Sequence, residues 1–241
     1  MIALLCSVQN EADLLLAQTK VYENTTLGSK PLYAGMLADQ EICLCVGGMG
    51  KVNAAHAATL LFTQFRPKSL ILFGIGGAYP ASGAEVGDVA LAREEIAGDE
   101  GVLTLDGFKD TEYISIPLAR AAGSNFFNCF LASEMLLNRA QHAVTRVVDS
   151  GRIHTGTFIT LSTCTGTSNR AAELDTQYHG LCENMEGAAV AQVATLHNIP
   201  WIEIRGISNI VEDRDLNKWD IPLAAEAAQK AVIGILKEWE T

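Results

Sequence analysis

Two short segments in the carboxyl-terminal half of the chain carry side chains that could bind a polar ligand. Residues 182–189 place Glu186 just ahead of a run of glycine and alanine, and residues 205–209 end a predicted strand in Asn209. A carboxylate accepts hydrogen bonds from paired hydroxyl groups, such as those of a sugar, whereas an amide both donates and accepts. The two segments therefore predict a pocket that holds a ribose through Glu186 and a base through Asn209.

Each of these residues also has a simpler explanation. A glutamate in the first turn of a helix stabilises the helix dipole, which would account for Glu186. Asparagine is a common turn former, which would account for Asn209. Glu11 follows the first predicted strand and, taken alone, indicates no more than an exposed acid at a helix start. Function must therefore be judged from the elements that bring these residues together.

Strands and helices alternate from end to end. This order predicts a single α/β domain over residues 1–241, a three-layer α/β/α sandwich around a mixed, mostly parallel sheet. Residues 98–130 mix glycine, aspartate and aromatic residues and indicate a loop-rich insertion. We expect strands at 2–8, 41–47, 69–73, 86–91, 153–162 and 201–207, and helices at 10–22, 51–65, 169–178, 186–197 and 221–239.

Ligands bind such sheets at the carboxyl ends of the strands. The candidate site residues all follow or end predicted strands, since Glu11 follows the first, Gly74–Gly77 end the third, and Ser208 and Asn209 end the last. Residues 158–162 end a further strand. We expect these segments to meet at one edge of the sheet.

Charge and hydropathy exclude several classes of protein. The net charge of −11 and the pI of about 4.9 disfavour nucleic-acid phosphates and anionic membranes as partners. No apolar run is long enough to span a membrane. The first residues lack the basic region of a signal peptide, and Glu11 and Asp13 follow at once. We therefore expect a cytoplasmic protein that binds a small molecule.

The cysteines and histidines indicate no metal site and no cofactor. None of the six cysteines forms a C-x-x-C pair, and no histidine lies at ligand spacing from one. Cys43 and Cys45 alternate along an apolar strand, so we expect both to be small buried hydrophobic residues.

Two glycine-rich turns resemble nucleotide-binding loops only in part. Residues 47–51 would need Gly at position 45 and Ser or Thr at position 52 to form a phosphate loop, but the chain has Cys45 and Val52. Residues 74–79 begin like a dinucleotide fingerprint, and acidic residues follow about 20 positions on, but Tyr79 replaces the final glycine. We expect these glycines to allow close approach of a ligand to the backbone.

Taken together, these pieces resemble the nucleoside phosphorylase/nucleosidase superfamily over nearly the whole chain. The nearest branch is that of the methylthioadenosine/adenosylhomocysteine nucleosidases and futalosine hydrolases. No single motif is decisive, but their order and spacing make the resemblance specific. The motifs lie at residues 7–11, 50–55, 74–77, 87–89, 184–189 and 205–209.

The resemblance implies cleavage of a purine nucleoside at its N-glycosidic bond. Glu186 would hold the ribose hydroxyls with Met185 packed on the sugar, and Glu11 would activate water as the general base. Phe158 or Ile159 would flank the purine. Further substrate contacts would come from Ile75, Gly76, Gly77 and Ser208.

Asn209 departs from the adenine-specific members, which carry an aspartate there as the acid at the purine N7. An amide cannot protonate N7, but it can donate a hydrogen bond to N7 or O6 of a 6-oxopurine. The resemblance of residues 208–221 to the futalosine hydrolase branch then implies release of hypoxanthine and dehypoxanthine futalosine in menaquinone biosynthesis. Arg214 would bind the substrate's carboxylate or, alternatively, form a surface salt bridge with Asp213 or Asp215.

Three alternatives stay open. A phosphorylase would need a phosphate site beside the ribose, and the glycine turns offer no arginine for it. A methylthioadenosine-type nucleosidase is disfavoured by Asn209. A purine-nucleoside-binding module would not need Glu11 placed for water. The resemblance further implies a homodimer or larger homo-oligomer, in which residues 98–130 could contribute side chains to a neighbour's pocket.

Overall fold

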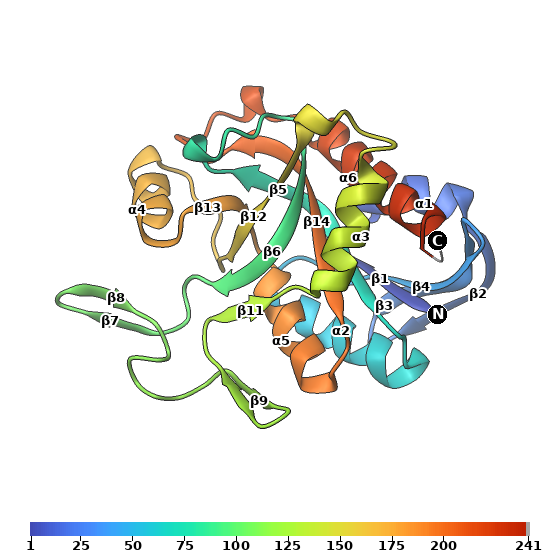
Figure 1. Cartoon of the computed structure of the whole chain (residues 1–241), viewed down its shortest axis with the longest axis horizontal. Helices are drawn as coiled ribbons and strands as arrows, with labels where there is room; N and C mark the ends of the chain where they lie inside the picture. Colours follow the sequence, from blue (N-terminus) through green and yellow to red (C-terminus); the bar gives the residue numbers. More distant parts are fainter. Residues whose placement is uncertain (240–241) are drawn as a thin grey trace.

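The computed structural model describes residues 1–239 and places one large mixed sheet between two layers of helices (Figure 1). The strands of this sheet are β1 (Ile2–Cys6), β2 (Lys20–Leu27), β3 (Lys30–Leu37), β4 (Gln40–Val46), β5 (Leu70–Ala78), β6 (Val89–Ala97), β11 (Cys129–Leu131), β12 (Ile153–Thr160), β13 (Gly180–Asn184) and β14 (Trp201–Ile210). The helices are α1 (Asp13–Gln18), α2 (Lys51–Phe65), α3 (Glu134–Val144), α4 (Ser168–Tyr178), α5 (Gly187–His197) and α6 (Ile221–Lys237).

The sheet runs in the order β11-β6-β12-β13-β5-β1-β4-β3-β2, and β14 pairs with both β5 and β6. Strand β5 is parallel to β1 and β14 but antiparallel to β13. Because β14 bridges β5 and β6, the strands β14, β6, β12, β13 and β5 close into a ring. This ring brings the carboxyl ends of β5 and β14 beside β13, where the candidate site residues lie.

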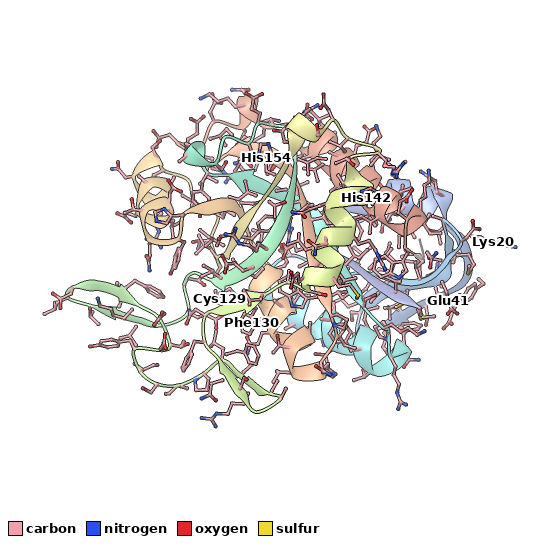
Figure 2. All side chains as sticks on the ribbon, viewed as in Figure 1. Lys20, Glu41, Cys129, Phe130, His142 and His154 are labelled. Atoms are coloured by element: carbon pink, nitrogen blue, oxygen red, sulfur yellow. The ribbon has the colours of Figure 1, made fainter. Side chains whose placement is uncertain are left out.

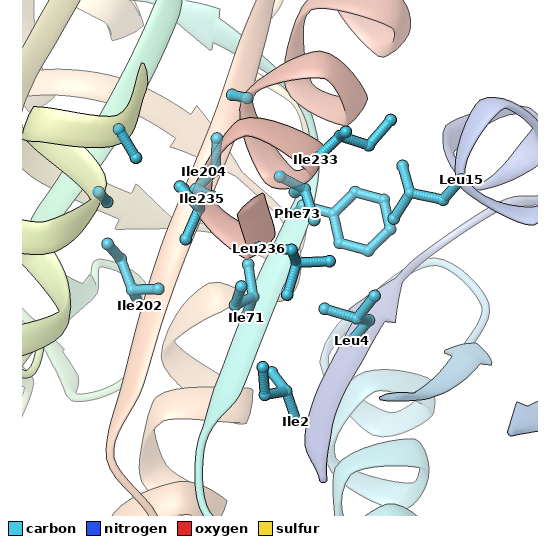
Figure 3. Close-up of a cluster of buried hydrophobic side chains, with 14 of the residues drawn as sticks. Ile2, Leu4, Leu15, Ile71, Phe73, Ile202, Ile204, Ile233, Ile235 and Leu236 are labelled. Carbon is cyan, nitrogen blue, oxygen red and sulfur yellow. The ribbon is translucent and has the colours of Figure 1, made fainter. Parts of the chain in front are cut away.

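Helices cover both faces of the central strands, and this explains their continuous apolar sequence. Side chains of α1, α3 and α6 pack on one face, and those of α2 and α5 pack on the other. Figure 3 shows Phe73 of β5 and Ile204 of β14 in one buried cluster with Ile233 and Leu236 of α6. The structure thus confirms the expected α/β sandwich with a mixed sheet.

Several predicted elements match the structure closely. The predicted helix at 51–65 coincides with α2, and those at 169–178 and 186–197 match α4 and α5 to within one residue. Cys43 and Cys45 are fully buried on β4, as expected. The strand predicted at 69–73 is longer, because β5 continues through the glycines to Ala78.

The predicted helix at 10–22 is wrong beyond its first turns. Helix α1 ends at Gln18, and the exposed edge strand β2 follows. The apolar run Leu14–Leu16 suits a helix, whereas Val21, Tyr22, Thr25 and Thr26 are β-branched or aromatic residues that suit a strand paired with β3. Strands β3 and β13 and helix α3 were not predicted.

The insertion expected at 98–130 forms two projecting hairpins (Figure 1). The first pairs β7 (Val102–Thr104) with β8 (Gly107–Lys109), and the second pairs β9 (Ala119–Ala121) with β10 (Ser124–Phe126). The chain then returns to the sheet through β11, on which Figure 2 labels Cys129 and Phe130.

Candidate active site

A cavity of about 190 Å³ lies where β5, β13 and β14 converge. It contains most of the residues singled out from the sequence, including Glu11, Glu186 and Asn209. Its charged lining consists of three carboxylates, Glu11, Glu183 and Glu186, and one guanidinium, Arg205. The rest of the lining is largely apolar or glycine, so the cavity suits a flat, neutral ring joined to a hydroxyl-rich group.

Glu11 is held rigidly at the cavity wall and is 3% exposed, so it is not the exposed helix-start acid of the simpler explanation. Its Oε2 accepts from the backbone N–H groups of Ser7 (2.9 Å) and Val8 (3.0 Å), and its Oε1 accepts from that of Ile75 (2.9 Å). Burial raises the pKa of Glu11, whereas Arg205 and the three N–H groups oppose the rise. A buried carboxylate with a raised pKa is suited to accept a proton from water.

Gly74 explains why β5 carries glycine at this point. A Cβ atom there would lie 2.6 Å from Glu11 Oε1 and 2.9 Å from Arg205 Nη1. Only a residue without a side chain lets β5 pass beneath these two charged groups. The glycines predicted to end the strand therefore lie inside it and make room for the site.

Glu186 immediately precedes α5 and is 4% exposed. Its Oε1 accepts from the Gly50 N–H at 2.8 Å, at the amino-terminal end of α2, and its Oε2 lies 3.3 Å from Arg205 Nη2. The dipole of α2 and the guanidinium both attract the carboxylate of Glu186. The glycine turn at residues 47–50 thus binds an internal carboxylate instead of a phosphate.

Asn209 lies near the end of β14 with a fixed amide orientation. The Ser208 hydroxyl donates to Asn209 Oδ1 at 2.8 Å, and Asn209 Nδ2 donates to the Ile210 carbonyl at 3.1 Å. An amide nitrogen has two hydrogens, so one N–H of Asn209 is left to donate to a ligand. The same cavity is lined by Gly76, Gly77 and Ser208.

Phe158 and Ile159 do not line the cavity, so their assignment beside a purine is corrected. Both are fully buried on β12, where Phe158 packs with Leu181 and Ile159 packs with Leu174. Strand β12 lies between β6 and β13, so its side chains enter the core on both faces. The chain reaches the cavity only after the strand has ended, at Cys164 and Thr165.

Cys164 and Thr165 were not singled out from the sequence. Cys164 Sγ lies 3.4 Å from Met185 Sδ, and together they form an apolar, polarisable wall. Thr165 is anchored by Glu183, whose carboxylate accepts from the Thr165 N–H at 2.7 Å and from its hydroxyl at 2.5 Å. The Tyr79 hydroxyl also donates to Glu183, at 3.1 Å. Nothing in the local sequence marks this loop, since its contacts come from β5 and β13.

Arg214 lies at the rim of the cavity. Its guanidinium is 4.8 Å from the centre of the Trp219 ring, and Trp219 itself lines the cavity. A small adjoining hollow contains Arg214 together with Thr165 and Asn209. Within residues 1–239, Arg214 forms no ion pair with Asp213 or Asp215, so the cation is directed by the aromatic ring.

Arg205 is the main site residue whose role was not predicted. It is 1% exposed, and its guanidinium contacts Glu203 Oε1 at 2.7 Å, the Ile75 carbonyl at 3.0 Å and Glu186. Although burial alone would lower the pKa of Arg205, the carboxylates of Glu203, Glu186 and Glu11 raise it. Arg205 and Glu203 stand among apolar residues in the first half of β14, and this was the available signal, since a buried guanidinium requires partners.

Among residues 1–239, no cluster of three or more histidine, cysteine, aspartate or glutamate side chains has the arrangement of a metal site. No helix in this part of the chain is long and apolar enough to cross a membrane. The polar side chains that line the cavity are carboxylates, amides, hydroxyls and one guanidinium.

This fold and cavity define a member of the phosphorylase superfamily, and the chain belongs to it, since residues 1–237 match the family model. A 5'-methylthioadenosine/S-adenosylhomocysteine nucleosidase of Maridesulfovibrio salexigens is 29% identical, with 98% of this chain and 99% of the relative aligned. These findings confirm the enzyme class expected from the sequence, a nucleosidase that hydrolyses an N-glycosidic bond.

Two solved structures share the fold. The 5'-methylthioadenosine/S-adenosylhomocysteine nucleosidase of Neisseria meningitidis, in complex with methylthio-immucillin-A, superposes with a TM-score of 0.84 at 24% identity, covering 98% of both chains. The futalosine hydrolase of Helicobacter pylori superposes with a TM-score of 0.82 at 20% identity, covering 98% of this chain and 97% of that one. At these identities the likeness establishes the fold.

Proposed function

We propose that this enzyme hydrolyses futalosine at its N-glycosidic bond and releases hypoxanthine and dehypoxanthine futalosine. The observation that carries the proposal is the amide of Asn209, which Ser208 orients within the cavity that also holds Glu11 and Glu186. An amide N–H can donate to N7 or O6 of a 6-oxopurine but cannot transfer a proton to adenine. A hypoxanthine leaving group tolerates the resulting negative charge through its oxygen.

The cavity supplies a group for each charge that develops in the reaction. In an oxocarbenium-like transition state, positive charge grows on the ribosyl carbon and negative charge grows on the purine. Glu186 stabilises the cationic sugar through its hydroxyls, and Asn209 stabilises the departing base. Glu11 removes a proton from the attacking water, and Met185 packs on the sugar.

The charge of the cavity favours water over phosphate as the nucleophile. Its only cation among the described residues is Arg205, whose guanidinium already contacts Glu186, Glu203 and the Ile75 carbonyl. A phosphate ion would meet the carboxylates of Glu11 and Glu186 without a free cation beside the ribose. We therefore propose hydrolysis, and turnover should not require phosphate.

Hydrolysis of methylthioadenosine or adenosylhomocysteine is the second candidate, because relatives at 28–30% identity over most of the chain carry that name. Asn209→Asp separates the two. An aspartic acid can protonate the purine N7, so the variant should gain ~10²-fold in kcat for adenine release relative to hypoxanthine release.

The matched control is Asn209→Ala, which removes the donor without supplying an acid. It should lose ~10²–10³-fold in kcat on futalosine without gaining activity on methylthioadenosine. Base release by each variant is followed chromatographically. An unchanged ratio of adenine to hypoxanthine in Asn209→Asp would show that this residue does not set base choice.

Arg214 is proposed to bind the carboxylate on the far side of futalosine from the purine. Arg214→Ala should raise the KM for futalosine about fivefold, since an exposed ion pair contributes up to about 1 kcal/mol. Inosine lacks that carboxylate, so its KM serves as the control and should stay the same. A futalosine KM that does not move would remove this role.

We also propose that the enzyme works as a homodimer or larger homo-oligomer. The projecting insertion exposes Leu103 and Leu105 on the first hairpin, and Tyr113 and Ile116 on the segment between the two hairpins. Exposed apolar side chains gathered on one segment indicate an interaction surface. Light scattering measures the mass directly. A monomer that retains full activity would exclude a shared site.

Incubation of the protein with futalosine, inosine and methylthioadenosine in separate phosphate-free reactions tests the proposed function. Hypoxanthine should form from futalosine, with little from inosine and no adenine from methylthioadenosine. Faster turnover on adding phosphate, with a ribose 1-phosphate-type product, would instead establish a phosphorylase.

A further inference from the structure

Two glutamates lie behind Glu186, outside the cavity, and neither is explained by the reaction. Glu95 on β6 and Glu203 on β14 are both 0% exposed. A Cβ atom at Gly187, the first residue of α5, would collide with Glu95 Oε1 and with Glu203 Oε2. The two carboxyl groups therefore face each other across this glycine, in a space that admits no side chain.

One oxygen of this pair lacks a hydrogen-bond donor. Glu203 Oε1 accepts from Arg205 Nε at 2.7 Å, but Glu203 Oε2 is the one buried side-chain nitrogen or oxygen atom in residues 1–239 without a partner. Leaving a buried carboxylate oxygen without a donor is costly. A proton on the facing Glu95 would supply the missing donor.

The surroundings indicate which of the two carries this proton. Glu203 accepts from the Arg205 guanidinium, whereas Glu95 accepts from the neutral side chains of Asn184 and Thr160. Burial raises the pKa of Glu95 well above its ordinary value, and the negative charge of Glu203 raises it further. The hydrogen bond from the Thr160 hydroxyl (2.7 Å) and the charge of Arg205 oppose this rise. The neighbouring thiols of Cys129 and Cys182 also have raised pKa values.

Both glutamates are linked to Glu186, but by different routes. Glu95 Oε1 accepts from Asn184 Nδ2 at 2.6 Å, and Asn184 Oδ1 accepts from the backbone N–H groups of Glu186 (2.9 Å) and Gly187 (2.7 Å). On the other route, Arg205 joins Glu203 to Glu186 Oε2. The first route fixes the main chain of Glu186, and the second fixes its carboxylate.

We propose that Glu95 shares a proton with Glu203, which closes a hydrogen-bonded ring through Asn184, Glu186 and Arg205. Glu95 and Glu203 are thus positioning residues that hold the carboxylate of Glu186 toward the sugar. The shared proton also limits the negative charge around Arg205. Without it, Glu11, Glu95, Glu186 and Glu203 would place four carboxylates around one guanidinium.

Infrared spectroscopy of the protein at neutral pH tests the shared proton without any substrate. The wild type should show the carbonyl band of a protonated carboxyl group, and Glu95→Gln should lack it. Asp88→Asn is the matched control, because Asp88 is a buried carboxylate whose pKa is lowered, with Arg152 at 2.8 Å. Asp88→Asn should lose intensity only in the infrared bands of ionised carboxylates. If Glu95→Gln also loses only carboxylate intensity, no proton is shared.

The positioning role rests on the proposed function and is measured by turnover of whichever nucleoside the wild type cleaves. Glu95→Gln should retain kcat within about threefold, because its amide can donate to Glu203 Oε2 while its oxygen accepts from Asn184. Glu95→Ala breaks the ring and should lower kcat ~10²-fold, as expected when a reacting group is misplaced. Equal kcat for both variants would remove the positioning role.

These outcomes separate the two proposals. A protonated-carboxyl band that disappears in Glu95→Gln, in a protein that cleaves no futalosine, would preserve the shared proton and overturn the substrate assignment. The infrared comparison needs only the wild type and the isosteric Glu95→Gln, so it stands even where Glu95→Ala does not fold.

Discussion

Glu11→Gln should lower kcat on futalosine by ~10²–10⁴-fold, the range expected for loss of a general base. The substitution keeps the shape of the side chain and one oxygen for the N–H groups of Ser7, Val8 or Ile75, so the fold should survive. Steady-state turnover and a thermal melt of the same preparation measure the two effects. Near-normal turnover would show that another group activates the water.

The pH profile gives an independent test of the same residue. Because burial raises the pKa of Glu11, kcat/KM should fall with decreasing pH at a midpoint above the ordinary value for glutamate. Below that midpoint Glu11 holds a proton and cannot accept one from water. In Glu11→Gln the residual rate should not show this acid limb, and a limb that persists unchanged would belong to a different group.

Arg205→Met should lower the free energy of unfolding by about 3–5 kcal/mol, which corresponds to a drop in Tm of roughly 10 °C. Arg205 is 1% exposed, and its removal leaves Glu203, Glu186 and Glu11 without their shared cation. Methionine fills a similar volume, so the loss reflects the uncompensated charges more than a cavity.

Arg170→Met is the matched control for this stability prediction. Arg170 forms an i,i+3 pair with Glu173 on α4, and both side chains are exposed, so its loss should cost less than about 1 kcal/mol. Denaturant unfolding of both variants gives the comparison. Similar stabilities for Arg205→Met and Arg170→Met would contradict a central role of the guanidinium in the site.

The sequence predicted those parts of the fold in which local pattern and tertiary environment agree. Helix α2 was predicted to the residue because residues 51–65 are rich in Ala and Leu, a glycine turn precedes them and Pro67 follows. Strand β2 was missed because three leucines at Leu14–Leu16 resemble a helix that continues through the edge strand. Its pairing with β3 is a tertiary contact that no local pattern contains.

The site residues were likewise predicted in part. The sequence placed Glu11, Glu186 and Asn209 at strand or helix ends, and the structure brings them into one cavity. Phe158 and Ile159 were misplaced because both lie within β12, where they are buried, and after this strand the chain first reaches the cavity at Cys164.

The pairing of Glu95 with Glu203 behind Glu186 could not be predicted from the sequence. Glu95 and Glu203 lie on strands far apart in the chain, and they meet only because β14 pairs with both β5 and β6. The burial of two carboxyl groups beside Gly187 is a consequence of that closed arrangement of strands. The contact between the two carboxyl groups is tertiary, so no local sequence pattern indicates it.

A competition experiment tests the central claim most directly. Equimolar futalosine and methylthioadenosine are mixed in one phosphate-free reaction, and hypoxanthine and adenine are followed together at early times. Their ratio equals the ratio of the two kcat/KM values. We predict that hypoxanthine exceeds adenine by at least ~10²-fold, because Asn209 can donate to a 6-oxopurine but cannot protonate adenine. An excess of adenine would contradict the futalosine assignment and establish the methylthioadenosine reaction in its place.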